Sequence, residues 1–116
     1  MKIKCFEEII AWQKAQELAV EIYQNFNKSK DFGFRDQICR AAVSVSNNIA
    51  EGFDRSTDAD FRRFLFIALG SCSEVKSMVY LSVKLKILHI EKSSTLFNQT
   101  NEIAKIINGL IKSISK

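Results

Sequence analysis

QICRAAVSVSNNIAEGFDRSTDADFRRFLFIALGSCSE, residues 37–74, is the stretch that decides the fold. Apolar residues recur in it at three- and four-residue spacing on both sides of a short turn, which predicts two amphipathic helices. In the first helix Ile38, Val45 and Ile49 share the apolar face. The opposite face carries Arg40, a serine, two asparagines and Glu51, a pattern that suits a specific polar contact.

The rest of the chain predicts two more helices of the same kind. The first two expected helices are Phe6–Asn27 and Phe34–Glu51, with Gly52 as the stop of the second. The third is expected from Thr57, its capping residue, to about Lys86. The last follows Glu91–Ser94, where a serine would cap, and runs to Ile114. The chain has no proline and only four glycines. Together with the short loops, this predicts an all-α fold: one antiparallel up-down-up-down four-helix bundle over residues 1–116.

Composition narrows the class of protein. The formal net charge is +4 and the pI is near 9.1, which favours either polyanion binding or a solvated basic surface. The three cysteines are odd in number and have no CxxC spacing, so we expect a reducing compartment and a cytoplasmic location. No secretory signal and no run of 18 apolar residues is visible, so no membrane partner is expected.

The sequence offers no catalytic chemistry. A di-iron bundle needs Glu-x-x-His pairs, but the only histidine is His89, in a predicted loop without a glutamate three residues before it. There is no glycine-rich phosphate loop and no nucleophile–base pair. We therefore predict a non-enzyme with no catalytic residue, metal, cofactor or small-molecule substrate.

The polar stripe has a structural and a functional interpretation. In the structural one, Arg40 and Glu51 pair with charges on the third helix or a neighbouring subunit, and Asn48 bridges a backbone group. Its expected members are Ser44, Asn47, Asn48, Glu51, Ser71 and Glu74. In the functional one, Arg40 and the arginines of the second turn gather and contact phosphates of RNA or DNA, because guanidinium binds phosphate bidentately.

The expected nucleic-acid-binding residues are thus Arg40, Arg55, Arg62 and Arg63. Asp54, Asp58 and Asp60 lie beside them in the sequence and would compete for the same cations. Both interpretations remain open from the sequence.

Four apolar residues fall outside the stripes that one core requires. Phe66 and Ile67 point away from the main stripe of the third helix, and Ile106 and Ile111 widen that of the fourth. We expect these four residues to form the contact surface of a homo-oligomer.

The chain resembles the bacterial 23S rRNA intervening-sequence proteins, some of which carry a ribosomal-protein label. The resemblance covers nearly the whole chain and is strongest in the NIAEG run at residues 48–52 and the later GS-x-x-E at residues 70–74. It is carried by Gln37-Ile38, Arg40–Val45, Asn48–Gly52, Arg55, Phe61, Phe64-Leu65, Ala68, Gly70-Ser71 and Glu74-Val75, and by the opening Phe6, Ala11–Ala15 and Ile22-Tyr23. Ser46 departs from the pattern, which leads us to expect proline there.

The resemblance implies a short antiparallel bundle that assembles into a ring, expected to be a homopentamer, with no enzymatic activity. Genes of this family are often found in insertions within 23S rRNA genes. The fold is also similar to accessory proteins of diversity-generating retroelements, which are basic rings that bind nucleic acid. Our leading hypothesis is a non-enzymatic oligomeric bundle that binds RNA or DNA through a basic surface. The alternative is a structural or protein-interaction module with no nucleic-acid role.

Overall fold

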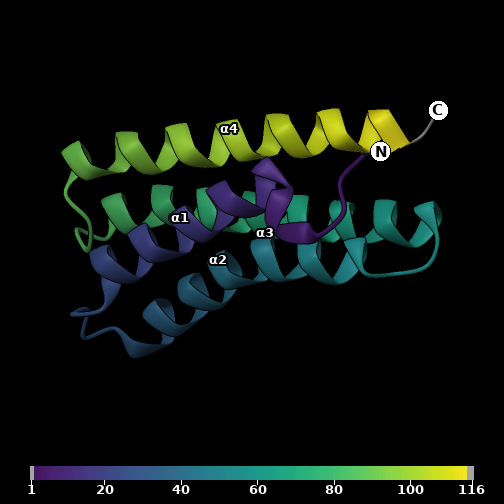
Figure 1. Cartoon of the computed structure of the whole chain (residues 1–116). Helices are drawn as coiled ribbons and strands as arrows, with labels where there is room; N and C mark the ends of the chain where they lie inside the picture. Colours follow the sequence, from purple (N-terminus) through teal and green to yellow (C-terminus); the bar gives the residue numbers. More distant parts are fainter. Residues whose placement is uncertain (1, 115–116) are drawn as a thin grey trace.

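A computed structural model describes residues 2–114, and their regular structure is entirely helical. The elements are a 3-10 turn η1 (Phe6–Glu8), α1 (Ile10–Phe26), α2 (Phe32–Phe53), α3 (Asp58–Lys84) and α4 (Ile90–Ile114). Each of the four long helices packs against its two neighbours in the cyclic order α1, α2, α3, α4. The predicted antiparallel four-helix bundle is confirmed (Figure 1).

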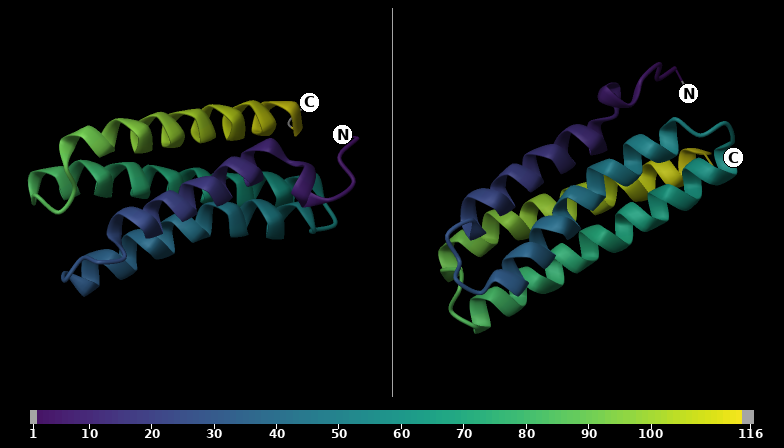
Figure 2. Two further views of the ribbon diagram at one scale, coloured as in Figure 1. Left: turned by 60° about the vertical axis from the view of Figure 1, so that its left-hand side comes forward. Right: turned by 90° about the horizontal axis from the view of Figure 1, so that it is seen from below.

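The two ends of the bundle differ in what they carry. The α1–α2 and α3–α4 connections lie together at one end, and the α2–α3 connection lies at the other end with both termini (Figure 2). The bundle measures 44 × 22 × 19 Å, so these two ends are well separated.

The apolar faces predicted from the sequence form one continuous core. Ile38, Val45 and Ile49 of α2 are fully buried in it, and Cys72 of α3 is buried beside them. Burial of these faces is what holds the four helices together, because each helix alone would leave an apolar stripe in water.

The first helix begins later than predicted. Residues 6–8 form the separate turn η1, and Ile9 is extended, with φ −76° and ψ 118°, before α1 begins. The break lets Ile9 turn into the core, while Phe6 packs edge-on against Trp12 with ring centroids 5.2 Å apart. The Gln13 side chain donates to the Glu7 carbonyl at 2.8 Å and closes the junction.

The fourth helix begins earlier than predicted, and the expected serine cap is wrong. Ser93 Oγ donates to the Ile90 carbonyl at 2.6 Å, and Ser94 Oγ donates to the Glu91 carbonyl at 3.4 Å. Serine hydroxyls satisfied in this way fit inside a helix. His89, in the connection as predicted, accepts from the Glu91 amide through Nδ1 at 3.4 Å.

The ends of α2 and the start of α3 are defined by local hydrogen bonds and one close contact. Asp31 caps α2 by accepting from the Phe34 amide at 3.1 Å, and Thr57 caps α3, as predicted, by accepting from the Asp60 amide at 3.1 Å. Gly52 does not stop α2, which continues to Phe53. A Cβ at Gly52 would lie only 2.5 Å from Phe64 Cβ, so the glycine is a site of close helix approach.

The end of α3 has a backbone conformation that is unusual for its residue. Ile87 N donates to the Ser82 carbonyl at 2.9 Å and Lys86 N to the Val83 carbonyl at 3.0 Å, the two bonds of a Schellman motif. Lys86 has φ 60°, in the left-handed region where glycine is the usual residue. The helix therefore ends at Lys84, two residues before the predicted end.

We expect Gly52→Ala to lower the free energy of unfolding by about 1–3 kcal/mol, because the added methyl overpacks the α2–α3 contact. Gly109→Ala in α4 is the matched control. Its Cβ would meet no atom within 4 Å, so helix propensity alone should raise stability by roughly 0.5–1 kcal/mol. Urea denaturation followed by circular dichroism measures both, and equal stabilisation by the two substitutions would contradict the close contact.

Candidate nucleic-acid interface

A row of polar side chains joins α2 to α3 along their outer seam. Gln37 Nε2 donates to Glu74 Oε2 at 3.2 Å, and Ser44 Oγ lies 2.9 Å from Ser71 Oγ. Asn48 Nδ2 donates to the Ser44 carbonyl at 2.8 Å and to Ser44 Oγ at 2.9 Å. We call these five residues the α2–α3 polar ladder. They bond to one another, and the bond from Asn48 to the Ser44 carbonyl is the backbone contact expected of Asn48 in the structural interpretation.

The rest of the stripe differs in its contacts. Glu51 pairs with Arg55 four residues later, at 2.8 Å, and not with α3. Asn47 and Arg40 are exposed. Arg40 has no carboxylate within 4.0 Å among residues 2–114, so the expected Arg40 ion pair on α3 is wrong within this chain.

Two arginines of the predicted phosphate cluster are held against one aromatic ring. Arg55 lies over the Phe64 ring at 4.9 Å, and Arg63 lies over it at 4.7 Å. Arg63 is also 3.8 Å from Asp60. Cation–π contacts and ion pairs thus use both guanidiniums to cover Phe64, as the competing carboxylates in the sequence suggested.

The predicted four-arginine cluster does not form as one site. Arg62 lies beside Arg63 but has no carboxylate within 4.0 Å among the described residues. Arg40 is 13 residues before Phe53, the last residue of α2, which is about 20 Å along the helix axis from the turn that carries Arg55. Helical rise keeps Arg40 in a different neighbourhood from the turn.

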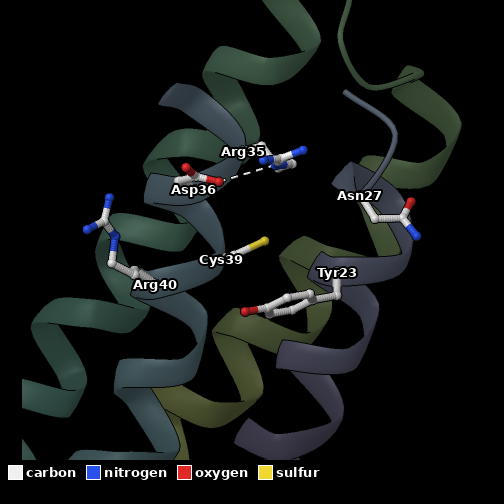
Figure 3. Close-up of a pocket in the computed structure, with 6 residues that line it drawn as sticks. All are labelled: Tyr23, Asn27, Arg35, Asp36, Cys39 and Arg40. Carbon is white, nitrogen blue, oxygen red and sulfur yellow. Dashed lines mark hydrogen bonds and ion pairs between the residues drawn. The ribbon is translucent and has the colours of Figure 1, made fainter. Parts of the chain in front are cut away.

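Shallow hollows surround Arg40 on three sides. One, of about 510 Å³, lies between α1 and α2 and is lined by Tyr23, Asn27, Arg35, Asp36, Cys39 and Arg40. In Figure 3 Cys39 and Tyr23 face each other across it, whereas Arg40 extends away from Cys39. The other two are lined by members of the polar stripe and again by Arg40. Arg35 is paired with Asp36 at 3.2 Å, so Arg40 supplies the unpaired charge of this face.

The cysteines are poor nucleophiles. Burial raises the pKa of the Cys72 thiol to about 11, and its Sγ donates to the Thr100 carbonyl at 3.3 Å. Burial also raises the pKa of Cys39. Both thiols are protonated at neutral pH, and a thiol is far less reactive than a thiolate. Within residues 2–114 no group of three His, Cys, Asp or Glu side chains is placed to hold a metal ion.

The residues expected at an oligomer surface divide into two groups. Phe66 is 55% exposed and Ile67 is 42% exposed, so both remain candidates. Ile106 is partly buried against the core. Ile111 is only 7% exposed and belongs to the core, because its position on α4 faces the other helices. The interface prediction for Ile111 is therefore corrected.

α3 carries several apolar side chains that the core does not cover. By length and composition it would qualify to cross a membrane, a test that the core helix of a soluble bundle also passes. Only 39% of its qualifying 18-residue window is buried within the bundle. Exposed apolar side chains on this helix include Phe66, Ile67, Tyr80, Leu81 and Leu85.

Sequence reasoning missed two residues that join helices. Gln37 belongs to the polar ladder, and its position seven residues before Ser44 was an available signal. Ser46 Oγ accepts from Gln16 Nε2 at 2.9 Å and so joins α2 to α1. Ser46 thus uses the position where proline was expected for a buried hydrogen bond that proline cannot make.

Comparisons with known proteins agree with this geometry. The sequence profile described as 23S rRNA-intervening sequence protein matches residues 7–109, so the chain belongs to that family. A solved structure from Bacteroides thetaiotaomicron, a protein of unknown function from the S23 ribosomal protein family, is 30% identical with a TM-score of 0.83. The match covers 89% of this chain and 99% of that chain. Among curated proteins, no sequence matches.

We expect the Ser44–Ser71 hydrogen bond to contribute about 0.5–1.5 kcal/mol of coupling between α2 and α3. A double-mutant cycle with Ser44→Ala and Ser71→Ala measures it from urea denaturation. Ser73→Ala, at an exposed position on α3, replaces Ser71→Ala in the control cycle and should show no coupling. Equal coupling in the two cycles would show that the ladder does not join the helices.

Proposed function

We propose that this member of the 23S rRNA-intervening sequence protein family is a non-enzymatic, homo-oligomeric four-helix bundle that binds RNA or DNA through a basic surface. The hollows described around Arg40 are shallow, which suits surface recognition of a large partner. The family description associates relatives with an RNA gene but assigns no activity.

The observation that carries the nucleic-acid role is the surplus of unpaired cations. Ion pairs within 4.0 Å involve Lys14, Arg35, Arg55 and Arg63, and the other basic side chains of residues 2–114 have no such partner. Unpaired surface cations attract phosphates and release counterions when they bind.

The four candidate arginines contribute unequally in this proposal. Arg40 and Arg62 are available without breaking an ion pair. Arg55 and Arg63 would have to exchange Glu51 and Asp60 for a phosphate. That exchange is inexpensive, because exposed ion pairs contribute only about 0–1 kcal/mol each.

Chemistry supports a binding role over a catalytic one. The buried thiols are protonated, and the only histidine lies in the α3–α4 connection, far from Cys39 and Cys72 in the sequence. We therefore assign no catalytic residue, cofactor or small-molecule substrate. Three free cysteines are consistent with a reducing, cytoplasmic location.

The exposed apolar side of α3 supports the proposed self-association. Phe66 and Ile67 are adjacent, exposed and apolar, which is costly in a monomer and favourable at a subunit contact. The resemblance makes a pentamer the expected stoichiometry. A ring would repeat the basic surface in every subunit, and several weak contacts would then add up to useful avidity.

The same apolar side of α3 also favours the second candidate, a protein-interaction module with no nucleic-acid role. The two candidates differ in their response to salt. Phosphate binding weakens steeply as salt rises, whereas apolar protein contacts do not.

We expect the protein to bind a fluorescent fragment of its host's 23S rRNA insertion, and an unrelated RNA, with affinity that falls roughly tenfold or more between 50 and 200 mM salt. Arg40→Gln with Arg62→Gln should weaken binding severalfold and reduce the salt slope by about 1.4, since each single-strand phosphate contact contributes about 0.7. The matched control, Arg55→Gln with Arg63→Gln, should have a smaller effect. Fluorescence anisotropy measures both, and absent or salt-insensitive binding would favour the protein-interaction module.

We expect a stable homo-oligomer at micromolar concentration in sedimentation velocity. Phe66→Ser with Ile67→Ser should shift it toward the monomer, because it removes two apolar anchors. Ile90→Ser is the control, since Ile90 is exposed at the start of α4 and not on this side of α3. A monomeric wild-type protein would contradict the assembly, and dissociation by the control alone would place the contact elsewhere.

A further inference from the structure

The basic charge of the chain is concentrated in its second hairpin. From Lys76 to Ile114 the sequence has six lysines and two glutamates, whereas residues 1–75 have ten basic and eleven acidic residues. One of the two glutamates, Glu102, is paired with Lys14 of α1 at 3.2 Å. The region that carries the surplus is therefore α4 and the second half of α3, not the arginine-rich turn.

An exposed aromatic ring lies in the middle of this basic region. Tyr80 is 53% exposed, and its ring packs on Phe97 of α4 with centroids 4.4 Å apart and planes tilted by 39°. Lys76 and Lys84 lie four residues before and after Tyr80, so all three side chains share one stripe of α3. Phe97 supports the Tyr80 ring and restricts its motion, while the outer part of the ring stays open to solvent.

A further cation follows Lys84 by two residues, just past the end of α3, at a costly backbone position. Lys86 is exposed and has φ 60°, where glycine would avoid the steric penalty of a side chain. Stability alone favours glycine at this position. A lysine here places a fourth charged or aromatic group next to Lys84.

Few acidic residues lie near these lysines and Tyr80 in the sequence. Between Lys76 and Asn101 the only acidic residue is Glu91, in the first turn of α4. Glu74 lies on the other side of α3, where it accepts from Gln37. Lys92 shares a hollow between α1 and α4 with Glu21, so we leave it out of the surface.

We propose that Lys76, Tyr80, Lys84 and Lys86 form a binding surface for single-stranded nucleic acid, with Tyr80 stacking on a base and the lysines contacting the adjoining phosphates. This assignment rests on the proposed function and gives it a location. An aromatic ring between cations is the arrangement that single-strand binders use, because every base has a face that stacks. A duplex keeps its bases stacked on one another and offers Tyr80 no such face.

The surface lies on the same face of α3 as the proposed subunit contact but further along the helix. Tyr80 follows Phe66 by 14 residues, which is about 21 Å along α3. It is also separate from the arginine turn, which lies at the opposite end of the bundle (Figures 1 and 2). Variants on this surface can therefore be compared with Arg55→Gln and Arg63→Gln.

The first test changes the ring alone. Binding of a fluorescent 20-nucleotide single-stranded RNA is measured by anisotropy at 50 mM salt. Tyr80→Phe should bind like wild type, because it keeps the stacking face. Tyr80→Leu should bind roughly 5- to 100-fold more weakly, the loss expected for one stacked base, while it still packs apolar atoms on Phe97.

The second test separates charge from stability. Lys86→Gly should raise the melting temperature, since it relieves the left-handed conformation, and should weaken RNA binding at the same time. Lys76→Gln combined with Lys86→Gly should reduce the salt slope by about 1.4. A purely structural lysine would not give a more stable protein with lower affinity.

The outcomes distinguish this surface from the general proposal. If wild type binds RNA in a salt-dependent way but Tyr80→Leu and the two lysine variants bind equally well, the surface is wrong and the proposed function stands. If wild type binds no RNA, both fail. Equal affinity for a duplex of the same sequence would also overturn the proposed single-strand surface. Loss of assembly in Tyr80→Leu, measured by sedimentation, would overturn it too, because Tyr80 would then be a subunit contact.

Discussion

The close approach of α2 to α3 at Gly52 is the constraint on which the rest of the structure depends. No side chain fits there, because Phe64 Cβ occupies the space that a Cβ on residue 52 would need. Contact at this point permits a connection of only four residues, 54–57, closed by the Thr57 cap. The same contact lets the small hydroxyls of Ser44 and Ser71 meet further along the seam. Close helix packing thus allows the α2–α3 polar ladder to form hydrogen bonds between the two helices.

The α2–α3 polar ladder determines which polar groups remain available to a partner. Ladder side chains are satisfied within the chain, and Arg55 and Arg63 lie over Phe64 at the turn, so the most polar part of the sequence is largely used for structure. Free cations lie elsewhere, above all on the α3–α4 hairpin. A group that bonds well inside the fold has less to gain from a ligand, since the ligand must first replace those bonds. Sequence motifs that look most informative are therefore not automatically the functional surface.

The sequence predicted the fold well because burial depends on periodicity, and periodicity is visible in a single chain. The same spacing placed Ser44, Asn48, Ser71 and Glu74 in the polar stripe, but it missed Gln37 and included Asn47 and Glu51, which make no bond to α3 in the structure. It failed where the outcome depended on a three-dimensional neighbour. Ser93 and Ser94 resembled caps but bond to carbonyls inside α4, and Gly52 resembled a stop but marks a helix contact. Ile111, expected at an oligomer surface, belongs to the core. Each of these residue types can have more than one local role in or near a helix, and the packing of the helices determined which role it has here.

The exposed residues at the two ends of α3 support a use for this helix besides packing. Maximal stability would favour polar residues at its exposed positions and glycine at the left-handed position after it, yet the chain has Phe66, Tyr80 and Lys86 at these places. Each choice costs solubility or stability. The packing of Tyr80 on Phe97 offsets part of this cost, and the proposed contacts with another subunit and with nucleic acid would offset more. Exposed apolar residues near the start of α3 suit another subunit, whereas the aromatic ring between lysines near its end suits a stacked base beside phosphates. A helix that departs from local rules at separate places, in chemically different ways, is best explained by two different partners.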